Sequence, residues 1–156
     1  MIKVLFVCLG NICRSPMAQF IFNYLVDQAG LGDKFEIDSA GTERYNEMVH
    51  AGIHHGTRSI FKQHKIPFTE HYARVIRKTD YDHFDYILIM EESNREDVLD
   101  IVGQDTDNKI HLLLEYSENL RGIRDPWYTG NFEETYEDVL EGCRSFLNRL
   151  IRNGKV

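Results

Sequence analysis

A cysteine and an arginine bracket a short loop near the start of the chain. Between Cys8 and Arg14 lie five residues: Leu9, Gly10, Asn11, Ile12 and Cys13. The backbone N–H groups of a short loop at a helix start can converge on one centre, where they and the helix dipole bind an anion. The planar guanidinium of Arg14 can hold two oxygens of a phosphate. We therefore expect this loop to bind a phosphate group.

Cys8 would lie beside that bound anion. The positive surroundings favour its thiolate, which is the nucleophilic form of cysteine. Gly10 relieves steric limits in the loop, and Asn11 tolerates the left-handed conformation that lets neighbouring N–H groups converge. The hydroxyl of Ser15 can donate toward the sulfur and stabilise it as a leaving group. The loop predicts an anion site and a nucleophile in one place.

A carboxylic acid near the loop would complete this chemistry, because a leaving oxygen departs more easily when it is protonated. Asp125 is the candidate. Pro126 restricts its backbone, and the turn at Gly130 indicates a positioned surface loop rather than a helix. Water would then attack the phosphocysteine with Asp125 as base, and no metal is required. An Asp-Pro pair alone is usually a turn signal, so this prediction depends on the Cys8 loop.

Other candidate residues are interpreted as structural. An isolated cysteine is more often a small core residue than a nucleophile, and Cys143, on the apolar stripe of the last predicted helix, is assigned to the core. The histidines lack partners at metal-ligand spacing, so no metal site is predicted. The acids from Glu91 to Asp100 are taken as a solvated helix face. A Walker-type nucleotide loop is excluded, because no Gly-Lys-Ser/Thr ending is present.

The elements that position these residues alternate along the chain. Apolar runs predict strands over residues 2–7, 35–38, 86–90 and 110–114. Helical spacing predicts helices over about 15–28, 51–64 and 93–101, and a last helix capped by Asn131. Ser15 and Pro16 mark the first helix start, with the Ser15 hydroxyl as a possible cap.

This alternation implies right-handed crossovers and a parallel sheet. We predict an α/β three-layer sandwich with a four-stranded parallel sheet flanked by helices on both faces. Ligands bind such sheets at the carboxyl ends of strands near the switch in strand order, which places the Cys8 loop at the site. The chain of 156 residues fits a single domain over 1–156.

Composition excludes several classes of protein. The chain has a net charge of −7 and so lacks the broad positive field that is typical of a nucleic-acid binder. No apolar run could span a bilayer, and the first seven residues are too short for a secretory signal. Three cysteines without disulfide or zinc spacing favour a reducing compartment. We expect a cytoplasmic monomer with no nucleic-acid or membrane partner.

The segment V-L-F-V-C-L-G-N-I-C-R-S-P-M-A resembles the signature of the low-molecular-weight protein tyrosine phosphatases. Residues 38–42, 71–74, 84–88, 90–94 and 125–128 resemble further blocks of that family in the same order. The resemblance covers nearly the whole chain. It implies hydrolysis of phosphotyrosine in proteins, with inorganic phosphate as product, no cofactor, and Asp125 as general acid and base.

The resemblance also assigns supporting roles. Tyr45, Trp127, Tyr128 and Ile12 occupy positions where the family builds its substrate walls, and aromatic walls suit a phosphotyrosine ring. The buried hydrogen-bond set that fixes the loop would comprise Asn11, Ser39 and His71. Cys13 is implied to trap an oxidised Cys8 as a reversible disulfide, although it could equally be a packing thiol.

Three alternatives compete with this function. An arsenate reductase of the same fold needs further cysteines, and none lies between Cys13 and Cys143. Related protein-arginine phosphatases place a threonine where this chain has Ile12. Retention of the Cys8 loop and Asp125 argues against a non-catalytic phosphoprotein-binding module.

Four positions depart from the usual family pattern. Glu91 and His54 stand where aspartate is common, Tyr45 where some members have tryptophan, and Trp127 where tyrosine is frequent. These departures concern specificity and support of the loop rather than the reaction.

Overall fold

The computed structural model describes residues Met1 to Val156, which fold around a four-stranded parallel sheet. Its strands are β1 (Ile2–Cys8), β2 (Phe35–Gly41), β3 (Tyr86–Ile89) and β4 (Ile110–Leu112), in the order β2-β1-β3-β4. β1 pairs in parallel with β2 on one side and β3 on the other. The strand order therefore switches at β1, and the loop after β1 lies at the switch point.

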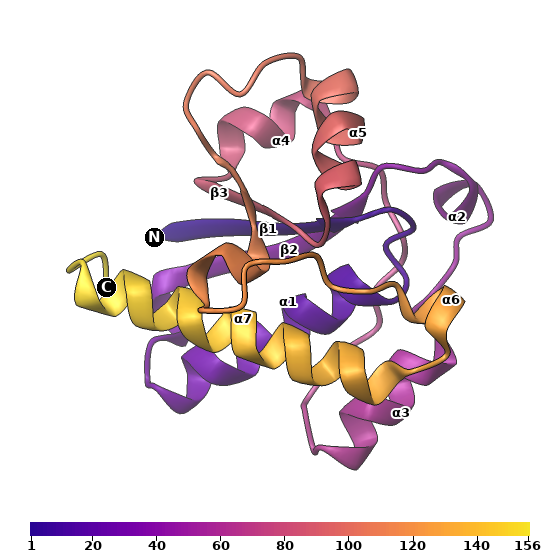
Figure 1. Cartoon of the computed structure of the whole chain (residues 1–156), viewed down its shortest axis with the longest axis horizontal. Helices are drawn as coiled ribbons and strands as arrows, with labels where there is room; N and C mark the ends of the chain where they lie inside the picture. The colour runs from indigo at the N-terminus through magenta and orange to yellow at the C-terminus, as the bar shows by residue number, and fades with distance from the viewer.

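Helices cover both faces of this sheet (Figure 1). One face carries α1 (Arg14–Gln28) and the long C-terminal α7 (Phe132–Arg152), with α3 (His55–Gln63) beside them. The other face carries α4 (Lys78–His83) and α5 (Glu92–Val102). The predicted α/β three-layer architecture is confirmed.

The apolar run of β1 forms a central strand because both of its faces are buried. Val4 and Phe6 belong to the larger hydrophobic cluster beneath α1 and α7, whereas Leu5 and Val7 belong to the smaller cluster beneath α4 and α5. All four side chains are fully buried. A strand covered on both faces needs a continuous apolar run rather than an alternating one.

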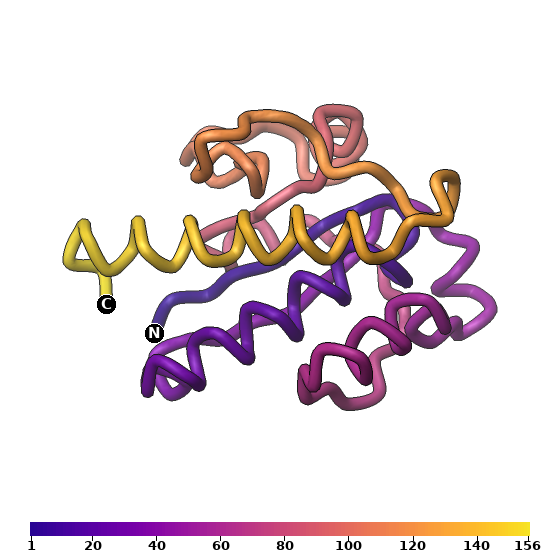
Figure 2. The backbone as a smooth tube through the Cα atoms, turned by 60° about the horizontal axis from the view of Figure 1, so that its bottom comes forward, coloured from indigo at the N-terminus to yellow at the C-terminus, as the bar shows by residue number.

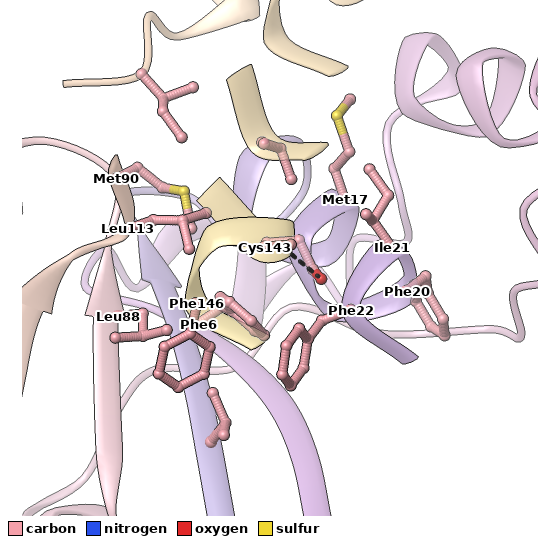
Figure 3. Close-up of a cluster of buried hydrophobic side chains, with 14 of the residues drawn as sticks. Phe6, Met17, Phe20, Ile21, Phe22, Leu88, Met90, Leu113, Cys143 and Phe146 are labelled. Atoms are coloured by element: carbon pink, nitrogen blue, oxygen red, sulfur yellow. Dashed lines mark hydrogen bonds between the residues drawn. The ribbon is translucent and has the colours of Figure 1, made fainter. Parts of the chain in front are cut away.

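Cys143 lies inside the larger cluster (Figure 3). Its thiol is fully buried beside Phe146 and faces the carbonyl oxygen of Ala18, with a sulfur–oxygen distance of 3.8 Å. Burial raises the pKa of Cys143 far above its ordinary value. The prediction that this cysteine is a core residue is confirmed.

Several predicted boundaries are wrong, for local reasons. Ser15 is not the cap of α1, because the helix begins at Arg14 with Cys13 at the cap position and no side-chain capping bond. Residues 113–114 continue not as strand but as the 3-10 helix η2 (Leu113–Tyr116), where Leu113 packs against α7. β2 extends to Gly41, beyond the predicted residues 35–38.

Four short segments complete the fold. They are the 3-10 helix η1 (Gly32–Lys34), the helix α2 (Tyr45–Met48), η2, and the one-turn helix α6 (Pro126–Thr129). The loop after β1, α2 and α6 gather at one end of the molecule (Figure 1), and both termini lie at the opposite end (Figure 2). None of the helices has the length and apolar character needed to cross a membrane.

Candidate active site

Two hydrogen-bond partners lie against the sulfur of Cys8, one in the loop between β1 and α1 and one in the first turn of α1. The backbone N–H of Asn11 donates to Sγ at 3.3 Å, and the Ser15 hydroxyl oxygen lies 3.0 Å from Sγ. Ser15 can make this contact because it lies in the first turn of α1, directly facing the loop. The sulfur therefore has one backbone and one side-chain hydrogen-bond partner at the start of α1.

Asn11 holds the shape of the loop. Its φ of 56° is the left-handed conformation expected from the sequence. Its side-chain NH₂ donates to the hydroxyls of Ser15 at 2.8 Å and Ser39 at 3.0 Å. Its carbonyl oxygen accepts from the backbone N–H of Arg74 at 3.1 Å and contacts Nε2 of His71 at 2.9 Å. The strained turn is thereby fixed by the sheet and by the 71–74 segment.

The contact between Asn11 and His71 determines which ring nitrogen of His71 carries the hydrogen. The amide carbonyl of Asn11 can only accept, so Nε2 of His71 carries the hydrogen. Burial lowers the pKa of His71; the charge of Asp38 opposes this shift, and the smaller effect of Arg74 adds to it. The hydroxyl of Ser39 donates to Gln19 at 2.6 Å. Gln19, which the sequence did not single out, therefore ends a buried chain of hydrogen bonds.

Arg14 is fully buried, and two acceptors from later parts of the chain orient its guanidinium. Its Nη1 donates to Glu91 at 2.8 Å and to the carbonyl of Ile123 at 2.9 Å. Burial would raise the pKa of Glu91, but a hydrogen bond from Ser93 and the charge of Arg14 outweigh it and lower the pKa. Glu91 stays ionised and pairs with Arg14, so its assignment to a solvated face was wrong.

Asp125 lies next to Arg14, at the start of α6. Its Oδ2 is 3.4 Å from Nη2 of Arg14, and its Oδ1 accepts the backbone N–H of Trp127 at 3.0 Å. The predicted loop is in fact a single helical turn, with Asp125 as its N-cap and Pro126 in its first turn. This cap fixes the carboxylate in place while leaving its side chain 19% exposed.

These groups meet in one cavity of about 240 Å³. The three predicted catalytic residues, Cys8, Arg14 and Asp125, all line it. Ser39 and His71 do not reach the cavity and support Asn11 from behind. Glu43 and Asn46, which were not predicted from the sequence, also line the cavity. The remaining lining residues were all predicted: Leu9, Gly10, Ile12, Cys13, Tyr45, Trp127 and Tyr128.

Cys13 lines the same cavity as a buried thiol. Burial, followed by the nearby Cys8 sulfur and the Asp125 carboxylate, raises the pKa of Cys13 to about 12. The opposing effects of Arg14 and of a hydrogen bond with Thr57 are smaller. Cys13 is therefore a neutral thiol at physiological pH.

A parallel sheet with a cysteine- and arginine-bearing loop at its switch point, faced by an aspartate, has a fold and a site that suit a phosphatase. The family of low molecular weight phosphotyrosine protein phosphatases matches residues 3–156. The chain belongs to this family.

Curated relatives match over most of their length. The chain is 42% identical over 149 residues to the low molecular weight protein-tyrosine-phosphatase YfkJ of Bacillus subtilis, covering 94% of each chain. It is 41% identical over 152 residues to the low molecular weight phosphotyrosine protein phosphatase of Homo sapiens, again covering 94% of each chain.

Solved structures show the same fold. The crystal structure of YfkJ from Bacillus subtilis superposes with a TM-score of 0.91 at 41% identity, covering 98% of this chain and 96% of that one. The drosophila arginine phosphatase DARP superposes with a TM-score of 0.85 at 35% identity, covering 95% of this chain and 97% of that one. Relatives with this fold are therefore named as tyrosine phosphatases and, for DARP, as an arginine phosphatase.

Proposed function

We propose that this phosphatase hydrolyses phosphotyrosine in proteins through a phosphocysteine intermediate on Cys8. The observation that carries the proposal is the convergence of Cys8, Arg14 and Asp125 on one cavity, with the sulfur held by Asn11 and Ser15. The aromatic rings of the cavity rim suit a phenyl ring attached to the phosphate.

In the first half of the reaction, the Cys8 thiolate attacks phosphorus and the bond from phosphorus to the tyrosyl oxygen breaks. The loop N–H groups and the Arg14 guanidinium stabilise the phosphoryl oxygens. Asp125 gives its proton to the departing oxygen. The products are an unphosphorylated tyrosine side chain in the substrate protein and a phosphorylated Cys8.

In the second half, water attacks phosphorus and gives a proton to Asp125. The sulfur–phosphorus bond breaks, inorganic phosphate leaves, and Cys8 becomes a thiolate again. The Ser15 hydroxyl, 3.0 Å away, stabilises the charge on the departing sulfur. Asp125 thus ends the cycle protonated, as it began.

Two other activities are weighed against this one. The similarity to DARP makes phosphoarginine the second candidate substrate, but Ile12 stands in the loop where related arginine phosphatases have threonine. An arsenate reductase would need further cysteines, beyond the two of the loop, to relay a disulfide. Cys143 cannot serve as one, because it is fully buried.

The test compares matched phosphotyrosyl and phosphoarginyl peptides, measuring released phosphate. The wild-type chain should hydrolyse the phosphotyrosyl peptide with the higher kcat/KM. Cys8→Ser should abolish turnover and keep phosphate binding, whereas Cys143→Ala, changed in the core, should keep turnover. A preference for phosphoarginine, or substantial turnover by Cys8→Ser, would refute the proposal.

The partners of such an enzyme are phosphotyrosine-containing proteins. Its three unpaired cysteines suit a reducing compartment such as the cytoplasm. We further propose that it acts as a monomer, which the mass measured by light scattering at working concentration would test.

A further inference from the structure

A second groove lies beside the catalytic cavity and carries a concentration of positive charge. It has a volume of about 610 Å³ and is lined by Arg44, Arg77 and Lys78, which we call the basic groove. Glu47 is the single acidic residue of its lining. The groove thus presents three cations and one carboxylate on a chain whose net charge is −7.

The cations of the basic groove are unpaired. Arg44, Arg77 and Lys78 are exposed, and none of them takes part in an ion pair. The Glu47 carboxylate accepts the backbone N–H of Val75 at 2.7 Å and so holds the wall of the groove. The three cations are therefore available to an anionic ligand.

One ridge, residues 42–48, separates the basic groove from the catalytic cavity. Tyr45 and Asn46 line the cavity, whereas Arg44, Glu47 and Met48 line the groove. α2 forms most of this ridge and stands at the active-site end of the molecule (Figure 1). A ligand that fills the cavity and crosses the ridge would reach the groove.

The ridge is tied directly to the phosphate-binding loop. The backbone N–H groups of Thr42 and Glu43 donate to the carbonyl of Leu9 at 2.9 and 3.0 Å. The side chain of Asn46 donates to the carbonyl of Gly10 at 3.0 Å. The separation between loop and groove is therefore fixed. A helix is about 10 Å across, which an extended peptide crosses in about three or four residues at roughly 3.3 Å each.

We propose that the basic groove binds acidic side chains of the substrate polypeptide, about three or four residues from the phosphotyrosine. This inference rests on the proposed function. Met48, 79% exposed on the ridge, offers apolar contact to the stem of a glutamate. A nucleic acid fits less well, because its many charges would meet the acidic remainder of the surface.

The test uses three phosphotyrosyl peptides of equal length. One carries glutamates on the N-terminal side of the phosphotyrosine, one carries them on the C-terminal side, and one has glutamine at all of these positions. We expect kcat/KM for at least one acidic peptide to exceed that of the neutral peptide by about tenfold at low salt, the equivalent of ~1.4 kcal/mol. Added salt should reduce this ratio, because exposed charges are screened.

The variant Arg44→Gln/Arg77→Gln/Lys78→Gln should bring the acidic-to-neutral ratio below about twofold, as expected when exposed charge pairs are lost. The ratio cancels any general loss of activity. A matched control, Lys34→Gln/Arg152→Gln/Lys155→Gln, removes the same charge from η1, the last residue of α7 and the segment after it, far from the groove, and should keep the ratio (Figure 1).

Equal rates for acidic and neutral peptides in the wild-type chain, or a ratio unchanged in the groove variant, would overturn the inference and leave the proposed function standing. If the wild-type chain hydrolysed none of the three peptides, both the inference and the proposed function would be overturned.

Discussion

Arg14 depends on Glu91 for its orientation, although the two residues are far apart in the sequence. The guanidinium is held from behind by Glu91 and by the carbonyl of Ile123, so its other nitrogen faces Asp125 and the cavity. A buried arginine that is already fixed loses little freedom when phosphate binds. Glu91 therefore acts as a positioning residue.

Glu91→Gln is expected to reduce kcat/KM for p-nitrophenyl phosphate about five- to tenfold, mainly through KM, because Glu91 is 38% exposed and its charge is partly screened. Glu92→Gln is the matched control, since Glu92 pairs only with Arg95 at the surface. Steady-state kinetics of the two variants decide the matter. Equal values for Glu91→Gln and the wild-type chain would show that Arg14 is oriented without this carboxylate.

The two cysteines of the loop should differ in reactivity toward alkylation. With its pKa raised to about 12, Cys13 is almost entirely a neutral thiol at neutral pH, and only thiolates react quickly. Limited treatment with iodoacetate should therefore label Cys8 first, and inorganic phosphate should protect it. Peptide mapping by mass spectrometry reads the site, and initial labelling of Cys13 would contradict this electrostatic picture.

At the scale of elements, α3 connects the phosphate-binding loop to α6 through His54. The His54 backbone N–H donates to the carbonyl of Ile12 at 2.9 Å, and its Nδ1 accepts from Gly56 at 3.0 Å as the cap of α3. The ring stacks on Phe132 and meets the edge of Trp127, with centroids 5.1 and 5.7 Å away. His54 thus contacts the loop after β1, α6 and α7.

Stability should fall on acidification because of His54. Burial, with a smaller contribution from His55, lowers the pKa of His54 in the folded chain, and a protonated ring can no longer accept from Gly56. The unfolded chain therefore binds the proton more tightly. The contribution of His54 is complete above its ordinary pKa of about 6.5 and is lost as the pH falls below that value.

Unfolding by urea between about pH 8 and pH 5 tests this dependence, with His54→Asn as the comparison. Asparagine keeps a capping acceptor and does not titrate, so this variant should lose less stability over that range. Trp127, the chain's only tryptophan, should report the protonation by its fluorescence in the wild-type chain alone. Identical pH profiles for the two chains would exclude His54 as the titrating group.

Elements with strong periodicity or a continuous apolar run were predictable, and short ones were not. β1 and α7 follow from the residues of their own segments, and Asn131 caps α7 as expected, with Oδ1 accepting from Glu134 at 3.0 Å. α2 and α4 are only four and six residues long, too short for a periodic pattern to emerge. Ser15 was misassigned because its hydroxyl is used by Cys8 and Asn11 rather than by the helix.

The candidate site divides in the same way. Residues of the loop could be predicted because strand, loop and helix follow one another in the sequence. Glu91, Gln19 and Asn46 could not, since each acts through a partner that only the folded chain brings near, and Glu43 reaches the cavity only because its backbone is bonded to the loop at Leu9. A single acidic or amide residue carries no local signal of such a partner.

For the molecule as a whole, stability depends on the close packing of α7 over the sheet. A Cβ on Gly142 would come within 2.6 Å of Cγ of Leu113 in η2. Gly142→Ala gains about 1 kcal/mol of helix propensity, but overpacking costs about 1–3 kcal/mol, so we expect a net loss of stability.

The free energy of unfolding measured in urea tests this expectation, with Glu137→Ala, an exposed change in the same helix, as the control. Gly142→Ala should be the less stable variant and should keep its kcat/KM, because Gly142 lies outside the cavity. A Gly142→Ala chain as stable as the control would show that Leu113 can move aside.

The covalent intermediate on Cys8 can be observed directly. In Asp125→Ala, p-nitrophenyl phosphate should still phosphorylate the enzyme, because its leaving group needs little protonation, while hydrolysis lacks its base and slows. Rapid acid quenching followed by mass spectrometry of the peptides should then find phosphate on Cys8. Phosphate on any other residue, or turnover without a phosphorylated enzyme, would contradict the account.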